Sequence, residues 1–164
     1  MLPELPPDAG LPAPQEITVT RTVQAKRPLV WRLWTESRHL AAWWGPDGFT
    51  NPECVIDPRP GGRLRIVMRA PDGEQFLTAG SVRVADAPER LVFTVALLNP
   101  DGSHRLENLT TVNFADNGDT TLVTVRVQVL QATAEAHDNL AGQRDGWTQS
   151  LERLSNLATK ETAQ

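Results

Sequence analysis

The sequence predicts an α+β fold in which a curved antiparallel sheet of seven strands surrounds one long C-terminal helix. Three observations lead to this prediction. Apolar and polar residues alternate in short runs between residues 17 and 129, two short helical stretches interrupt these runs directly after the first, and a helical period takes over after residue 134. Strands that follow one another without intervening helices form an antiparallel meander, and the twist of so wide a sheet makes it curl.

Length and composition are those of a single globular domain. The chain has 164 residues and a net charge of -4, and its basic residues are scattered, which argues against a nucleic-acid surface. One cysteine, Cys54, allows no intramolecular disulfide. No apolar run reaches the roughly 20 residues that cross a bilayer, and the N-terminus does not resemble a secretory signal. We therefore expect a cytoplasmic protein that does not insert into membranes.

The domain is predicted to occupy residues 16–160, after a flexible, proline-rich tail at residues 1–15. The tail holds too few apolar groups to offset the entropy of ordering. Residues 17–24 alternate as a β-strand does. Residues 27–35 then have apolar positions at helical spacing after a proline in the first turn. Ser37 is predicted to cap a second short helix that ends at Trp43 or Trp44.

Six further strands are predicted before the chain changes period. Turn sequences such as Pro71-Asp72-Gly73 and Asn117-Gly118 separate them. Alternation places Val82 and Val84 on one face of their strand. The six predicted strands cover residues 54–57, 63–69, 76–86, 91–97, 106–115 and 120–129.

A long amphipathic helix is predicted from Ala134 to about Thr159. Its apolar residues recur at steps of three, four and seven, which places them on one helical face. Gly142 and Gly146 lie inside it, and each costs about 1 kcal/mol relative to alanine. A close approach of the sheet, or a bend of the helix around it, would account for these glycines.

A pocket is predicted between the concave face of the sheet and the long helix, closed at one end by the two short helices. Such concave spaces are usually lined by apolar side chains. For each candidate, ordinary packing in the core is the alternative interpretation, and one of Trp43 and Trp44 is expected to face inward. Glu107 and Arg144 are the candidates that could orient a polar end of a ligand. The predicted ligand-binding residues are Trp43, Trp44, Leu64, Ile66, Met68, Phe93, Val95, Leu97, Glu107, Val112, Phe114, Arg144, Trp147 and Leu151.

The sequence predicts no catalytic residue, no metal site and no cofactor. Its histidines, His39, His104 and His137, fall on separate predicted elements and have no metal-binding spacing. Neither a phosphate-binding loop nor a known catalytic motif is present. Cys54 is interpreted as a small buried apolar residue.

Several short motifs together resemble one protein family. The chain is similar to the activator-of-heat-shock-protein-90-ATPase-like domains of the START/polyketide cyclase (SRPBCC) superfamily, in the expected order and over residues 16–160. The resemblance implies the helix-grip (START-like) fold and an internal cavity. The motifs that carry it are Val30-Trp31-Arg32-Leu33-Trp34-Thr35, Leu40-Ala41-Ala42-Trp43-Trp44-Gly45-Pro46, Pro60-Gly61-Gly62-Arg63, Met68-Arg69-Ala70-Pro71-Asp72-Gly73, Pro88-Glu89-Arg90-Leu91-Val92-Phe93 and Gly146-Trp147 with Leu151 and Leu154.

Three functions remain open at this point. The favoured one is non-catalytic binding of a small hydrophobic or aromatic ligand in the internal cavity. The resemblance also implies a polyketide cyclase or aromatase-like enzyme, which would need proton-transferring groups in that cavity. The third is a protein-interaction module such as a chaperone ATPase activator, which would need an exposed apolar patch. A role in a stress response and pairing into a homodimer are further hypotheses.

Overall fold

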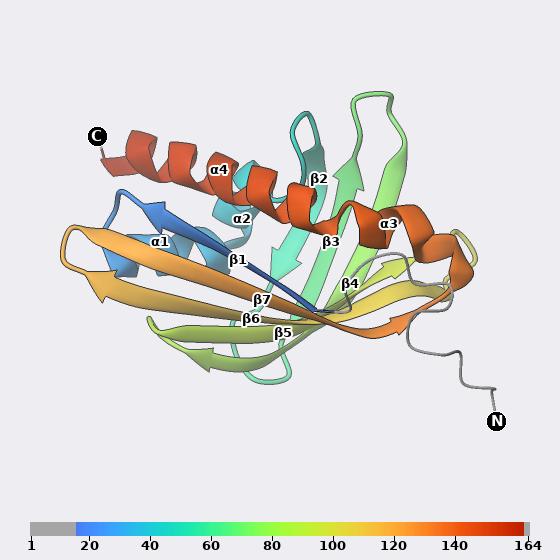
Figure 1. The fold of residues 1–164 in the computed structure, drawn as a ribbon, viewed down its shortest axis with the longest axis horizontal. Coiled ribbons are helices and arrows are strands. Elements are labelled where there is room, and N and C mark those ends of the chain that lie inside the picture. Colours follow the sequence, from blue (N-terminus) through green and yellow to red (C-terminus); the bar gives the residue numbers. More distant parts are fainter. Residues whose placement is uncertain (1–15, 163–164) are drawn as a thin grey trace.

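The predicted α+β fold is confirmed by the computed structural model, which describes residues 16–162 (Figure 1). The predicted tail at residues 1–15 lies outside the described residues. In chain order the elements are β1 (Glu16–Val23), α1 (Arg27–Thr35), α2 (Ser37–Trp43), β2 (Thr50–Ile56), β3 (Arg63–Arg69), β4 (Gln75–Asp86), β5 (Arg90–Leu98), β6 (His104–Asn117), β7 (Thr120–Ala132), η1 (Ala134–Ala136), α3 (His137–Ala141) and α4 (Gln143–Thr162).

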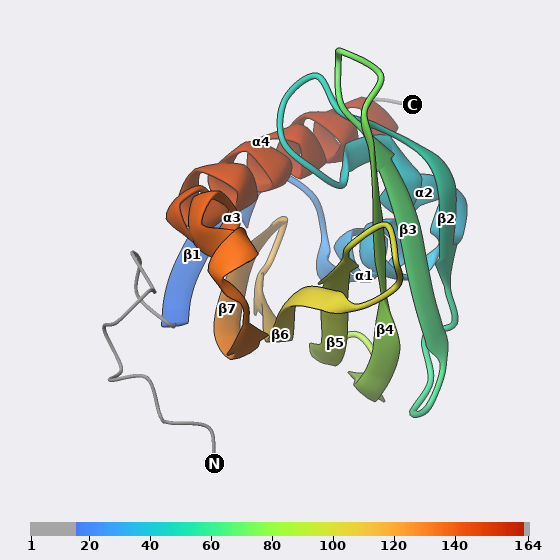
Figure 2. The same cartoon turned by 90° about the vertical axis from the view of Figure 1, so that its right-hand side faces the viewer.

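All seven strands form one antiparallel sheet in the order β1-β7-β6-β5-β4-β3-β2. Every neighbouring pair is adjacent in sequence except β1 and β7, so the first and last strands meet along eight paired residues. The sheet curls, and α4 lies across its concave side (Figure 2). This is the helix-grip arrangement that the sequence predicts.

The inward faces of the strands follow the predicted alternation along most of the sheet. On β7, Val123, Val125 and Val127 are fully buried. On β5, every second residue from Leu91 to Leu97 points toward the same inward side. The apolar face is therefore continuous from β5 through β6 to β7, and it supplies one wall of the core.

The prediction that Val82 and Val84 share a face of β4 is wrong. A β-bulge lies between them, because Val82 pairs with Phe93 while Val84 pairs with the adjacent Val92. One extra residue in a strand reverses the side to which later residues point. Val82 is therefore fully buried, and Val84 lies on the other face.

The two short helices close one end of the curved sheet. The bounds of α1 are those predicted, and α2 ends at Trp43, one of the two predicted ends. Trp34 and Trp43 are both almost fully buried there, with ring centroids 4.6 Å apart, and Nε1 of Trp43 donates to the carbonyl of Leu33 at 2.9 Å. Ser37 does not cap α2 as predicted. It is the first helical residue, and its hydroxyl accepts a hydrogen bond from the backbone N–H of Ile56 on β2.

The C-terminal helix is interrupted, which corrects the prediction of one continuous helix from Ala134. A 3-10 turn, η1, leads into the short α3, and Gly142 separates α3 from α4. Gly142 has φ -93° and ψ 0°, a conformation between helix and turn. The apolar face of α4 then packs on the sheet through Leu151, Leu154 and Ala158, which are buried.

Candidate ligand-binding pocket

A pocket of about 210 Å³ lies between the concave face of β3–β6 and the start of α4. Its apolar wall comes from both sides of the fold and includes two of the five tryptophans. Because strands direct every second side chain to the same face, β3, β5 and β6 each contribute apolar side chains to this wall. The apolar side chains of the wall are Trp44, Pro46, Met68, Val95, Leu97, Leu106 and Trp147.

Two tryptophans shape the apolar end. The ring centroids of Trp44 and Trp147 are 5.4 Å apart with an interplanar angle of 81°. Trp147 also stacks on the buried Trp34 at 6.0 Å, and Trp44 contacts Phe93 at 6.2 Å. Aromatic pairs at such distances stabilise one another beyond their burial. The pocket wall is thus tied to the packed core behind it.

Arg153 holds the segment that carries Trp44. Its Nη1 donates to the carbonyls of Trp44, Gly45 and Pro46 at 3.2, 2.9 and 3.0 Å, and its Nη2 donates to the carbonyl of Phe49 at 3.1 Å. Partial burial lowers the pKa of the Arg153 guanidinium, and the charge of Asp47 opposes that shift. Arginine stays protonated in this setting, so one cation on α4 fixes the α2–β2 connection.

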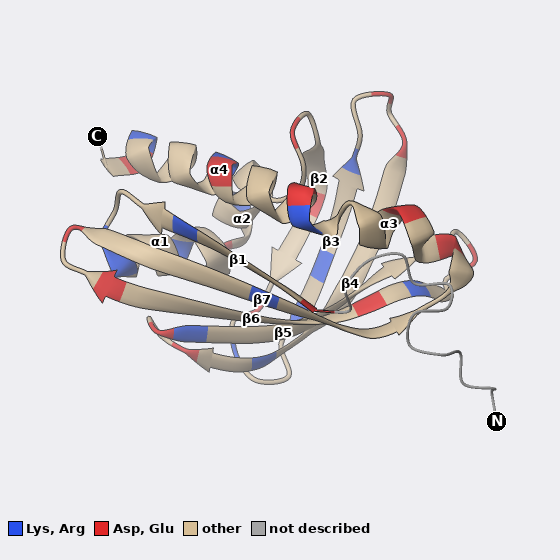
Figure 3. Cartoon of the chain, in the orientation of Figure 1, with Lys and Arg blue, Asp and Glu red and all other residues tan. Residues whose placement is uncertain are grey.

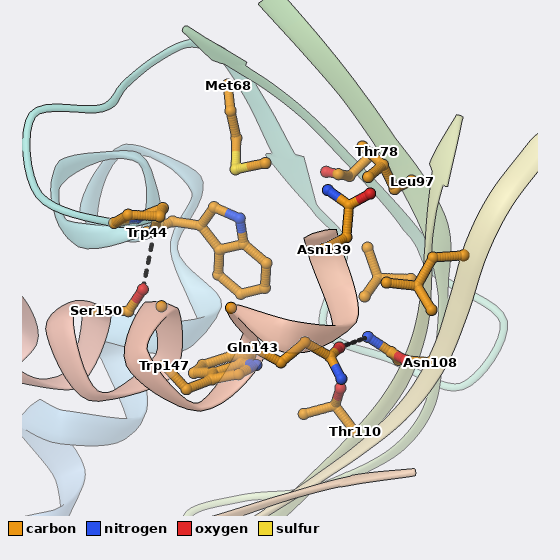
Figure 4. Close-up of a pocket in the computed structure, with 16 residues that line it drawn as sticks. Trp44, Met68, Thr78, Leu97, Asn108, Thr110, Asn139, Gln143, Trp147 and Ser150 are labelled. Carbon is orange, nitrogen blue, oxygen red and sulfur yellow. Dashed lines mark hydrogen bonds between the residues drawn. The ribbon is translucent and has the colours of Figure 1, made fainter. Parts of the chain in front are cut away.

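Polar side chains gather at the other side of the pocket (Figure 4). Nδ2 of Asn108 donates to Oε1 of Gln143 at 2.7 Å, which joins β6 to the first turn of α4. Asn108 is 9% exposed and Thr110 is 1% exposed. Oδ1 of Asn108 and Oγ1 of Thr110 are nevertheless without a hydrogen-bond partner among residues 16–162. By contrast, the hydroxyl of Thr78, which also lines the pocket, donates to the carbonyl of Ile66 at 2.9 Å.

The two helical glycines leave room for the pocket. A Cβ added at Gly146 would meet only Cγ of Pro46, at 3.9 Å, and one at Gly142 would meet only the carbonyl oxygen of Asp138, at 3.5 Å. Both residues line the pocket. The first explanation considered from the sequence, a close approach of the sheet, therefore does not apply to them, whereas Gly142 does mark the break between α3 and α4.

Every described residue that lines the pocket has an uncharged side chain. Elsewhere charges of both signs are interspersed along the strands and helices (Figure 3). Glu107 and Arg144 were the predicted polar candidates, and the structure corrects both. Glu107 alternates with the inward-facing Leu106 and Asn108 and so points to the other face. Arg144 is exposed, and its Nη1 donates to the carbonyl of Thr18 at 3.1 Å.

The remaining predicted residues divide into two groups. Five of them line the pocket: Trp44, Met68, Val95, Leu97 and Trp147. Seven belong to the packed core instead, because α1, α2 and the second half of α4 fill that part of the concave face. The seven core residues are Trp43, Leu64, Ile66, Phe93, Val112, Phe114 and Leu151.

Sequence reasoning missed the polar end of the pocket. Asn108 and Thr110 occupy inward positions of β6, in register with Leu106 and Val112. A polar pair on the apolar face of a strand was the available signal. Asn and Thr are neutral and common on strands, so in the sequence alone they stand out less than charged residues or histidines.

No group of three or more His, Cys, Asp or Glu residues within residues 16–162 could hold a metal ion. His39 is buried beside Glu36, with Nε2 3.3 Å from Oε1, and His104 lies near Glu107. Burial raises the pKa of the Cys54 thiol to about 12, so this thiol stays protonated at neutral pH. None of the helices in this part of the chain is long and apolar enough to span a membrane.

Comparison with known proteins gives the same fold and one family. The family model described as "Activator of Hsp90 ATPase homolog 1-like protein" matches residues 24–159. No curated protein is significantly similar in sequence. A crystal structure of a protein from Rhodobacter sphaeroides is 26% identical, with a TM-score of 0.73 over 91% of this chain and 96% of that chain.

Two further solved structures resemble the fold at lower identity. A protein from Nitrosomonas europaea is 24% identical, with a TM-score of 0.75 over 96% of this chain and 99% of its own. The AHSA1 protein from Silicibacter pomeroyi is 20% identical, with a TM-score of 0.78 over 89% of this chain and 99% of its own. At these identities the likeness concerns the fold alone.

Proposed function

We propose that this chain, which belongs to the Activator of Hsp90 ATPase homolog 1-like family, binds a small hydrophobic or aromatic ligand between its sheet and α4 without transforming it. The observation that supports this most directly is the pocket of about 210 Å³. Two tryptophans, a methionine and aliphatic side chains wall it, and such walls are typical of sites for apolar molecules. A cavity of roughly 150 Å³ holds one benzene molecule, so this pocket suits a ligand of one or two rings.

The glycines of the C-terminal helix support the same proposal. Glycine inside a helix costs about 1 kcal/mol relative to alanine, and no neighbour would clash with a Cβ at Gly142 or Gly146. The break after α3 accounts for Gly142. For Gly146 the remaining explanation is the volume of the pocket that it lines, because a side chain at this position would reduce that volume. A ligand in this space would bury the apolar side chains of the pocket wall, which favours binding.

The enzyme hypothesis has less support. Cyclase or aromatase chemistry requires groups that transfer protons, and the described lining of the pocket consists of residues with no ionisable side chain. The chaperone-activator hypothesis needs a large apolar patch. Within residues 16–162, the exposed large apolar side chains are Val55 and Leu130, which lie on β2 and β7, with four strands between them in the sheet. A chaperone partner, a homodimer and a cytoplasmic location stay predictions.

Native mass spectrometry of the gently purified protein, repeated after denaturation, tests the proposal. We expect an additional mass of a small organic molecule that is lost on unfolding. A ligand at a hundred times its Kd also stabilises the fold by about 2.7 kcal/mol, so adding it back should raise the Tm.

Matched variants locate the binding. Gly146→Phe places a ring in the pocket and should remove the additional mass. Thr148→Phe places the same ring on the exposed side of the same helix and should keep it. The proposal is contradicted if both variants retain the mass equally, or if the bare protein is found and no one- or two-ring compound raises its Tm.

A further inference from the structure

We propose that the pocket selects an uncharged ligand whose ring body carries one hydroxyl or amide group, which is bound by Asn108 and Thr110. This inference rests on the proposed function and adds the charge and the polar group of the ligand. It is carried by two buried polar atoms, Oδ1 of Asn108 and Oγ1 of Thr110, that have no partner within the described residues. Both side chains line the pocket.

Such atoms are costly to the free protein. A polar atom that is buried without a partner gives up its hydrogen bond to water and receives none in return. Other buried threonines in this sheet avoid that cost. The hydroxyl of Thr121 on β7 donates to the carbonyl of Ala25 at 2.8 Å, and Thr78 donates to Ile66. Thr110 differs from them in lacking a partner, and we infer that the ligand supplies it.

The geometry favours a group that both donates and accepts. Asn108 and Thr110 are two residues apart on β6, so their side chains lie on one face and about 7 Å apart along the strand. A ligand group bound by both would also lie beside the amide of Gln143, which Figure 4 shows next to the two side chains. The hydroxyl of Thr110 can donate or accept, while Asn108 presents an acceptor. A ligand hydroxyl or amide satisfies this pair, because it can donate to Asn108 and accept from Thr110.

The conclusion does not depend on how the two amides are oriented. If the side chains of Asn108 and Gln143 are both rotated by 180°, the bond between them is kept with donor and acceptor exchanged. One amide then offers a free acceptor and the other a free donor, as before. The polar end therefore matches a ligand that makes both kinds of hydrogen bond.

The neutral lining sets the charge of the ligand. A carboxylate or an ammonium group in this pocket would lose its hydration without meeting an opposite charge, since the described lining holds none. A neutral hydroxyl loses far less on transfer and regains it through Asn108 and Thr110. We therefore expect alcohols, phenols or amides to bind and the corresponding acids to be excluded.

Three probes with the same ring body test this by calorimetry at pH 7: 2-naphthol, 2-methylnaphthalene and 2-naphthoate. The first two differ only by a hydroxyl in place of a methyl group. We expect 2-naphthol to bind about tenfold more tightly than 2-methylnaphthalene, the effect of one well-made hydrogen bond, and 2-naphthoate to bind most weakly.

Two substitutions test whether Thr110 and Asn108 cause the preference for the probe with a hydroxyl group. In Thr110→Val and in Asn108→Leu the preference for the hydroxyl should fall toward one, while 2-methylnaphthalene still binds. Thr110→Val should also raise the Tm of the free protein by a few degrees, because it removes an unpartnered buried hydroxyl. The matched control Thr121→Val removes a partnered one, so it should lower the Tm and leave the preference unchanged.

The outcomes separate this inference from the proposed function. If 2-naphthol and 2-methylnaphthalene bind equally, or if the preference survives both substitutions, the polar selection is refuted and binding of ring compounds stands. If 2-naphthoate binds most tightly, the neutral character of the ligand is refuted. If none of the three probes binds, the inference is refuted, while the proposed function is decided separately by the mass spectrometry and the Tm measurements described above. A drop in the Tm of Thr110→Val would contradict the unpartnered state of its hydroxyl.

Discussion

One strand and one helix run through two very different interiors in this molecule. At the end closed by α1 and α2, β6 presents Phe114 and Val112 to a packed core, and α4 presents Leu154. At the other end the same strand presents Thr110 and Asn108 to a pocket. The two ends are continuous, and no domain boundary separates them.

The difference shows what decides whether a concave sheet is filled. Trp34 and Trp43 from α1 and α2, together with the ring of Phe114, occupy the closed end, with Trp34 and Phe114 centroids 5.9 Å apart. Those helices do not reach the other end, where α4 begins with Gln143 and carries Gly146. The sheet has an inward face at both ends, so the covering helices, rather than the strands, create the pocket.

The largest expected effect comes from a matched pair of substitutions, one at each end. Leu154 is fully buried in the core, so Leu154→Ala should destabilise the fold by about 2–5 kcal/mol. Leu97 is half-buried and lines the pocket, so Leu97→Ala enlarges an existing space and should cost about 1 kcal/mol. Urea denaturation of both variants measures the difference. Equal costs would mean that the pocket end is as tightly packed as the core.

Arg153 connects the two ends, and removing it should have the next largest effect. Arg153→Met breaks its bonds to the carbonyls of Trp44, Gly45, Pro46 and Phe49, at an expected cost of about 2–3 kcal/mol. Lysine lacks the forked geometry, so Arg153→Lys should recover little. The control is Arg144→Met, which breaks one exposed bond and should change stability by less than about 0.5 kcal/mol. Similar losses in the two Met variants would contradict the connecting role.

Gly146→Ala should stabilise the fold, whereas the substitutions above destabilise it. The added methyl group meets only Pro46, at 3.9 Å, so the variant should gain about 0.5–1 kcal/mol from helix propensity. Because the methyl group projects into the pocket, ligand affinity should fall at the same time. Thermal denaturation and calorimetry measure the two effects. Gly118 has φ +80°, and Gly118→Ala should lose stability for that reason.

The smallest expected effect concerns pH. Hydrogen bonds from Arg126 and Arg65 lower the pKa values of Glu16 and Glu53, which join β1 to β7 and β2 to β3. A carboxylate whose pKa is lower in the folded state stabilises the fold at pH values above its unfolded-state pKa, which is near 4.5. This stabilisation is lost as the pH falls through the folded-state pKa. Stability should therefore decrease modestly below pH 4.5, and Arg126→Gln should reduce that decrease. Ligand affinity, in a pocket lined by neutral groups, should stay constant from pH 5 to 9.

Most of the fold could be predicted from the sequence because its signals are local. Alternation fixes the faces of β5 and β7, and the helical spacing after Arg27 fixes α1. The bulge in β4 has no such signal, since one unpaired residue changes no composition. In the sequence, the break in the helix is marked only by the glycine at position 142. A glycine there is equally consistent with a bend and with a close approach of the sheet.

The candidate site was less predictable, because it depends on contacts between distant segments. Period two shows that Leu64, Phe93 and Val95 share the concave face, but only the placement of α1 and α2 decides that Leu64 and Phe93 are core and that Val95 lines the pocket. The alternation along β6 predicts that Asn108 and Thr110 lie on the inward face of the sheet. Their lack of partners could be known only from the three-dimensional structure.

The tryptophans that wall the pocket also make this protein its own optical probe. The chain contains no tyrosine, so its near-ultraviolet emission arises from the indole rings. Trp43, Trp34, Trp147 and Trp44 form a series of neighbouring rings with centroid separations of 4.6, 6.0 and 5.4 Å, and excitation passes readily between rings this close. The last two rings of the series border the pocket. A molecule that enters should change the emission of the whole series, and occupancy could be followed by fluorescence without any label.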